Sequence, residues 1–88
     1  MVSAQVTVTN RQGFHMRPAS LFAQAMGKFQ SSVTLRHGDR AVDGKSVMNL
    51  MAACMKQGTS LTVECDGPDE SEALAEAVAL IRSGLGEN

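Results

Sequence analysis

Residues 32–42 read SVTLRHGDRAV, and this stretch decides the fold. Val33 and Leu35 alternate with polar neighbours, a period of two that predicts a half-buried β-strand. The Gly38-Asp39 pair is typical of a tight turn, and the apolar residues 41–42 follow it. We therefore expect a β-hairpin here, and the flanking segments decide what packs against it.

Upstream of the hairpin, the chain predicts one strand and one helix. The alternation of Val6 and Val8 with threonines predicts a strand over roughly residues 3–9. After a turn at residues 10–13, apolar side chains recur at helical spacing, at Ala19, Phe22, Ala23 and Met26. Gly27 is a plausible stop signal. A helix is therefore expected directly after His15.

Downstream of the hairpin, the pattern predicts a short helix, a strand and a longer helix. Ser46 can cap the short helix, which we expect to end near Gly58 with one apolar face made of Val47, Leu50, Met51 and Cys54. Residues 61–65 alternate as a strand. Asp69 or Ser71 can cap the last helix, whose expected apolar stripe is Leu74, Val78, Ile81 and Leu85.

The resulting order, β-α-β-β-α-β-α, favours an α+β fold. We expect an open-faced two-layer sandwich, in which a four-stranded antiparallel sheet carries three helices on one face. A chain of 88 residues is near the lower end of sizes that build one core unaided, so residues 1–88 are interpreted as a single domain.

Composition excludes several classes of function. The formal net charge of -1 and the lack of a long basic run argue against a nucleic-acid partner. No apolar run suits a membrane span, and no signal peptide is evident, so we expect a cytoplasmic protein. Cys54 and Cys65 are expected to be buried free thiols. His15, His37 and the cysteines lack ligand spacing, so neither a metal nor a cofactor is expected.

Residues 13–19, GFHMRPA, carry the chemistry. They place His15 at a helix N-terminus, where free N–H groups and the helix dipole favour an anion such as phosphate. Arg17 adds a forked cation suited to phosphate oxygens, and Pro18 suits the first helical turn. A neutral imidazole nitrogen could act as the nucleophile. On chemistry alone, a simple helix cap or a surface histidine remains an alternative interpretation.

The same seven residues resemble the phosphorylation-site motif of the HPr family, histidine-containing phosphocarriers of the bacterial sugar phosphotransferase system, and the element order matches that family's fold. The resemblance implies that His15 accepts a phosphoryl group at Nδ1, with Arg17 as its charge partner. It implies phosphorylated enzyme I as donor and enzyme IIA domains as acceptors, in a carrier that is not itself an enzyme and needs only to be a monomer. A carrier of a nitrogen-related branch and a non-catalytic α+β interaction module remain the alternatives.

Residues 43–51, DGKSVMNLM, also resemble the family, where some members are phosphorylated by a dedicated serine kinase. That resemblance implies a regulatory role for Ser46, although Asn49 stands where kinase-regulated members usually carry glycine. The alternative is an ordinary helix cap. Leu50 and Met51 are expected to be buried, while the family's partner face suggests an exposed docking patch of Met16, Ser20, Gln24, Val47 and Met48.

Overall fold

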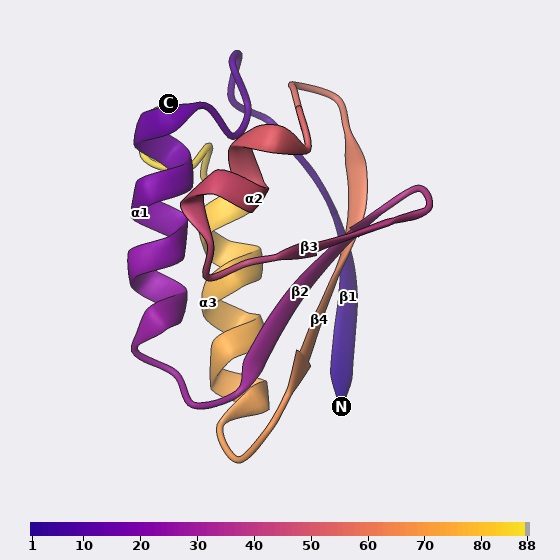
Figure 1. Cartoon of the computed structure of the whole chain (residues 1–88), viewed down its shortest axis with the longest axis vertical. Coiled ribbons are helices and arrows are strands. Elements are labelled where there is room, and N and C mark those ends of the chain that lie inside the picture. The colour runs from indigo at the N-terminus through magenta and orange to yellow at the C-terminus, as the bar shows by residue number, and fades with distance from the viewer. Residues whose placement is uncertain (88) are drawn as a thin grey trace.

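The computed structural model describes residues 1–87 and contains the seven expected elements in the expected order. The strands are β1 (Val2–Thr7), β2 (Ser32–His37), β3 (Arg40–Asp43) and β4 (Ser60–Asp66). The helices are α1 (Met16–Gly27), α2 (Val47–Ala52) and α3 (Glu70–Arg82). Figure 1 shows the helices on one side of the sheet, which confirms the open-faced α+β sandwich.

The sheet is antiparallel throughout, in the order β1-β4-β2-β3. The predicted hairpin is confirmed, with Leu35 opposite Val42 and His37 opposite Arg40 across the Gly38-Asp39 turn. The first strand ends at Thr7 rather than residue 9. Val8 nevertheless stays attached to the sheet, because its N–H donates to the Thr59 carbonyl at 2.9 Å.

The core lies between the sheet and the helices. From the sheet, the buried side chains include Val6, Val33, Leu35, Val42, Leu61 and Val63. From α1, the predicted residues Ala19, Phe22, Ala23 and Met26 are all buried, and α2 contributes Leu50. The α3 stripe is centred on Ala73, Ala77 and Ile81, with Leu74 and Val78 half-buried beside it. Small alanines let this helix approach the sheet closely.

The end of α2 differs from the prediction. The helix stops at Ala52, and Cys54 has a left-handed backbone with φ of 54°. The chain turns there because the Met55 carbonyl accepts a hydrogen bond from the Phe14 N–H at 3.0 Å. This turn exposes Cys54, so its predicted burial is wrong, whereas Cys65 is buried as expected. It also buries Met55 and leaves Met51 38% exposed, which reverses the expectation for Met51.

Asp69 precedes α3 at the N-cap position, but its side chain makes no cap hydrogen bond to that helix. Its carboxylate instead accepts hydrogen bonds from the N–H groups of Gln30 and Ser31, at 3.0 and 2.9 Å, and from the Ser31 hydroxyl at 2.5 Å. The Ser31 hydroxyl in turn accepts from the Asp69 N–H. Asp69 therefore ties the loop before β2 to the start of α3.

The bonds to Asp69 make the fold sensitive to acid. The Ser31 hydroxyl and the Gln30 N–H are the main causes that lower the pKa of Asp69 from 3.8 to about 2. A carboxyl whose pKa is lower in the folded state stabilises the fold above its unfolded pKa. This contribution is therefore lost as the pH falls from about 4 towards about 2.

We expect Asp69→Asn to lower the free energy of unfolding at pH 7, and the difference from wild type to shrink between pH 4 and pH 2. Ser31→Ala, which removes a fully buried hydroxyl, should lower it by about 1–2 kcal/mol and also flatten the pH dependence. Urea unfolding followed by circular dichroism at four pH values measures both. An Asp69→Asn profile parallel to that of wild type would contradict the expectation.

Candidate functional site

His15 occupies the position immediately before α1. Its backbone is extended, with φ of -80° and ψ of -172°, and its carbonyl accepts the first helical hydrogen bond from Ala19 at 2.9 Å. The side chain makes no cap hydrogen bond to the helix, and it is 36% exposed. The imidazole is thus not used as a helix cap, and a surface histidine is the alternative interpretation that is left.

The start of α1 offers donors to an anion. The first N–H groups of a helix have no intrahelical partner. Since Pro18 has no N–H, those of Met16 and Arg17 are left beside His15. The Arg17 side chain is exposed, and it forms no ion pair with any of residues 1–87. A phosphate at this end of the helix would therefore meet backbone donors and a free guanidinium.

The loop before His15 is anchored from two sides. Asn10 is fully buried, and its Nδ2 donates to the Gly13 carbonyl at 2.8 Å. Phe14 is buried edge-to-face against Phe22 of α1, with ring centroids 5.4 Å apart. Together with the bond from the Phe14 N–H to Met55, these contacts fix the backbone that carries His15.

Glu87 is a site residue that the sequence does not reveal. The chain after α3 returns to the start of α1 (Figure 1), where Glu87 Oε2 lies 2.7 Å from His15 Nε2. Its Oε1 accepts from Asn10 Nδ2 at 2.9 Å. The hydrogen bond from Asn10, followed by the bond to His15 and the nearby charge of Arg17, lowers the pKa of Glu87 below its usual value. The carboxylate is therefore ionised at neutral pH.

His15 also lines a shallow, mainly apolar cleft of about 230 Å³. Phe14 and Met55 belong to its wall, together with the exposed Met51, Cys54 and Lys56. His15 is thus reached from an open cleft, a setting that suits contact with another macromolecule.

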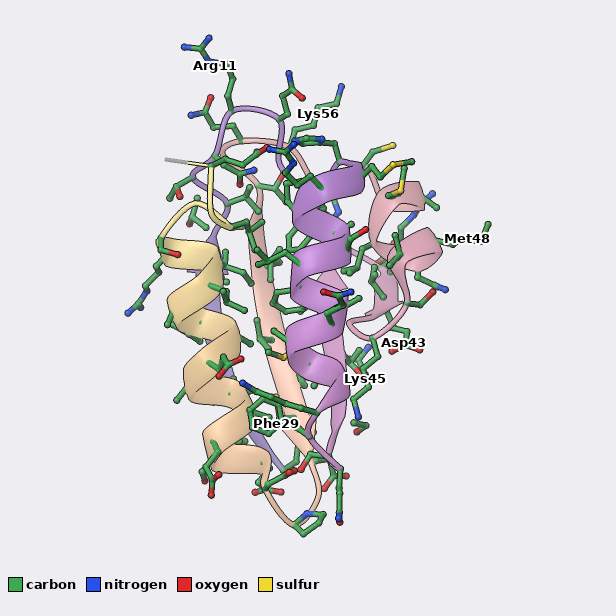
Figure 2. The ribbon with its side chains drawn as sticks, turned by 90° about the vertical axis from the view of Figure 1, so that its left-hand side faces the viewer. Arg11, Phe29, Asp43, Lys45, Met48 and Lys56 are labelled. Atoms are coloured by element: carbon green, nitrogen blue, oxygen red, sulfur yellow. The ribbon has the colours of Figure 1, made fainter. Side chains whose placement is uncertain are left out.

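The predicted docking patch is only partly exposed. Met16 and Met48 are 66% and 81% exposed, and Gln24 is also exposed. Figure 2 shows Met48 projecting from α2 away from the rest of the molecule. Ser20 is half-buried. The predicted exposure of Val47 is wrong, because its side chain is half-buried and packs against the core.

Ser46 caps α2 as predicted. Its Oγ accepts hydrogen bonds from the Asn49 N–H at 3.2 Å and from Asn49 Nδ2 at 2.9 Å. Both acceptor sites of the hydroxyl are therefore occupied by Asn49.

The described part of the chain holds neither a metal site nor a helix that could span a membrane. Among residues 1–87, no three His, Cys, Asp or Glu side chains lie together as they would to hold a metal ion. Within the same residues, no helix is long and apolar enough to cross a membrane.

The fold and site define a class of protein: a small α+β domain that presents a partly exposed histidine at the N-terminus of a helix. Residues 2–83 match the family model described as the PTS HPr component phosphorylation site. The chain therefore belongs to the HPr family of phosphocarriers in the phosphotransferase system.

Individual relatives resemble almost the whole chain. It is 38% identical over 87 residues to the phosphocarrier protein HPr of Cupriavidus necator, covering 99% of this chain and 98% of that protein. The crystal structure of HPr-C-His from Thermoanaerobacter tengcongensis superimposes with a TM-score of 0.94 at 35% identity, covering 100% and 99% of the two chains. A structure of an HPr dimer from the same organism matches with a TM-score of 0.78 at 36% identity, covering 99% and 100%.

Proposed function

We propose that this protein accepts a phosphoryl group on His15 from phosphorylated enzyme I and passes it to enzyme IIA domains, for sugar uptake and phosphorylation. The observation that carries the proposal is the imidazole of His15, which makes no cap hydrogen bond at the start of α1 and lies inside the residues matched by the family's phosphorylation-site model. The protein would work in the cytoplasm as a monomeric carrier that turns over only with its partners, and not as a free-standing enzyme.

The transfer step moves one phosphoryl group from phosphorylated enzyme I to this chain. Nδ1 of His15 attacks the phosphorus, a new N–P bond forms, and the bond between the phosphorus and the donor breaks with its electron pair returning to the donor group. Arg17 and the first N–H groups of α1 stabilise the charge on the transferred oxygens, because phosphoryl transfer depends mainly on positioning and electrostatics. The partner supplies the remaining groups.

Incubation with enzyme I and labelled phosphoenolpyruvate tests the proposal. We expect one label per chain that is lost in acid and retained in base, as a phosphohistidine requires. A labelled protein should then transfer the label to an enzyme IIA domain. A sugar-specific acceptor would support the sugar branch, whereas transfer only to a nitrogen-related IIA domain would support the alternative branch. An unlabelled chain would support the non-catalytic interaction module.

We propose that partners dock over the start of α1 and the exposed side of α2, on Met16, Ser20, Gln24 and Met48, with the half-buried Val47 packed behind them against the core. The strong exposure of Met16, which follows His15 in the chain, and of Met48 on α2 supports this, since flexible methionines adapt to several partners.

Met48→Glu should therefore raise the KM of enzyme I for this protein about tenfold, because a charge would replace an apolar interface contact. Steady-state phosphorylation at varied carrier concentration measures it. Ala75→Glu, which adds the same charge on an exposed position of α3, is the control and should behave as wild type. A large fall in thermal stability of Met48→Glu, with unchanged KM, would contradict a docking role.

For Ser46, we propose regulation by an HPr-type serine kinase that is slowed by Asn49. Attack on ATP needs a lone pair of Oγ, and the Asn49 side chain occupies one at 2.9 Å. Asn49→Ala should speed phosphorylation several-fold, Asn49→Gly should do the same, and Ser46→Ala should not be labelled. Labelling with the kinase and labelled ATP measures the rates. Equal rates in wild type and Asn49→Ala would rule out the slowing, and label on Ser46→Ala would rule out Ser46.

A further inference from the structure

Glu87 is held rigidly against His15 although 72 residues separate them in the chain. Its two oxygens have different partners: Oε1 accepts from Asn10 Nδ2 at 2.9 Å, and Oε2 lies 2.7 Å from His15 Nε2. Asn10 cannot move freely, because it is fully buried and its Nδ2 also donates to the Gly13 carbonyl. The side chain of Glu87 is only 25% exposed.

This geometry decides where the hydrogen of the neutral imidazole resides. An ionised carboxylate can only accept hydrogen bonds, so a contact of 2.7 Å requires a hydrogen on Nε2. In a neutral ring, one nitrogen carries the hydrogen and the other offers a lone pair. The lone pair is thus on Nδ1.

We propose that Glu87 is a positioning residue for phosphoryl transfer, which holds His15 in the Nε2–H form with Nδ1 as the nucleophile and stabilises the ring after Nδ1 is phosphorylated. This inference rests on the proposed carrier function and adds a residue to its site.

The charges balance as the step proceeds. When Nδ1 forms its bond to phosphorus, the hydrogen stays on Nε2, and the ring gains positive charge as the donor group recovers the electron pair of its broken bond. The Glu87 carboxylate lies directly against that charge, while the free guanidinium of Arg17 is left for the phosphoryl oxygens. The carboxylate thus orients and stabilises the ring, a role that a buried carboxylate fills for the histidine of hydrolytic triads.

Glu87→Ala, Glu87→Gln and Glu72→Ala test the proposal. Glu72 is an exposed carboxylate in the first turn of α3, at the opposite end of that helix from Glu87, and serves as the matched control. Glu87→Ala should lower kcat for uptake from enzyme I about tenfold with little change in KM. The kcat of Glu87→Gln should lie between those of Glu87→Ala and wild type, because the glutamine amide oxygen can still accept a hydrogen bond from Nε2–H. The control should match wild type.

The ring nitrogens give a readout that a purely structural role would not move. In ¹⁵N NMR spectra of the unphosphorylated protein, Nε2 of wild type should have the shift of a protonated nitrogen in a strong hydrogen bond. Glu87→Ala should lose that signature and show exchange between the two neutral forms, with the melting temperature recorded alongside. A wild-type kcat in Glu87→Ala would overturn the role of Glu87 in transfer, and unchanged ¹⁵N signals in that variant would overturn its role in placing the hydrogen on Nε2.

The two proposals fail in distinguishable ways. If wild type took no label from enzyme I, the carrier function would fall, and with it the role of Glu87 in transfer. If wild type were labelled on His15 and Glu87→Ala were labelled at the same kcat, only the role of Glu87 would fall.

Discussion

His15→Ala is expected to take up no label from enzyme I and phosphoenolpyruvate, while its free energy of unfolding stays close to that of wild type. The loss should be complete because the covalent bond is made by the imidazole itself, and alanine offers no nucleophile. The fold should tolerate the change because the ring makes no cap hydrogen bond to α1 and is 36% exposed. Stoichiometry of labelling and urea unfolding measure the two effects.

His37→Ala is the matched control, since His37 is the second of the two histidines in the chain. It lies at the end of β2, half-buried, and its Nδ1 has no hydrogen-bond partner among residues 1–87. This variant should still carry one label per chain. If acid-labile label remained on His15→Ala but disappeared from His37→Ala, the carrier residue would be His37, and the prediction for His15 would be wrong.

The sheet and the two long helices could be predicted because their signals are local. Val33 and Leu35 alternate with polar neighbours, and both are fully buried on the inner face of β2. Phe22 and Met26 recur at helical spacing, and both are fully buried in α1. In each case the period of the element alone selects the face that meets the core.

The end of α2 could not be predicted, because a distant contact decides it. The apolar period continues as far as Cys54, so the pattern alone extends the helix. The chain instead leaves the helix so that the Met55 carbonyl can accept from Phe14, which lies 41 positions earlier in the sequence. The errors for Cys54 and Met51 follow from that one turn.

The site, too, has residues that the sequence indicates and one that only the fold reveals. His15 and Arg17 stand in one short motif, and the resemblance to a family singles them out. Glu87 follows a glycine after the last helix, where no local pattern gives it a role. Burial of Leu85, which has a left-handed backbone with φ of 54°, turns the chain so that Glu87 reaches His15. Only the folded chain brings Asn10, His15 and Glu87 together.

Gly13→Ala is expected to lower the free energy of unfolding by about 3–5 kcal/mol. Gly13 has φ of 62°, in the left-handed region that disfavours a side chain. A Cβ at this position would lie 2.0 Å from the Met55 carbonyl oxygen and 2.7 Å from the Lys56 Cα. Both are backbone atoms, so the contact is relieved only if the loop before His15 separates from the turn after α2.

Alanine variants of two other glycines distinguish the stability cost of a left-handed backbone from the cost of the steric clash. Gly38 has φ of 61° but open space around it, so Gly38→Ala should lower the free energy of unfolding by about 1 kcal/mol. Gly27 has neither constraint, so Gly27→Ala should be neutral or stabilise the protein by up to about 1 kcal/mol. Urea unfolding of all three variants measures the series.

Separation of the loop before His15 from the turn after α2 should also slow phosphorylation of His15. The reason is that the Gly13 carbonyl accepts a hydrogen bond from Asn10, which also donates to Glu87. Labelling of Gly13→Ala by enzyme I, under conditions where the variant is folded, should therefore be slower than that of Gly38→Ala. Equal stability losses in these two variants, with equal labelling rates, would mean that the contact with Met55 does not constrain the loop that presents His15.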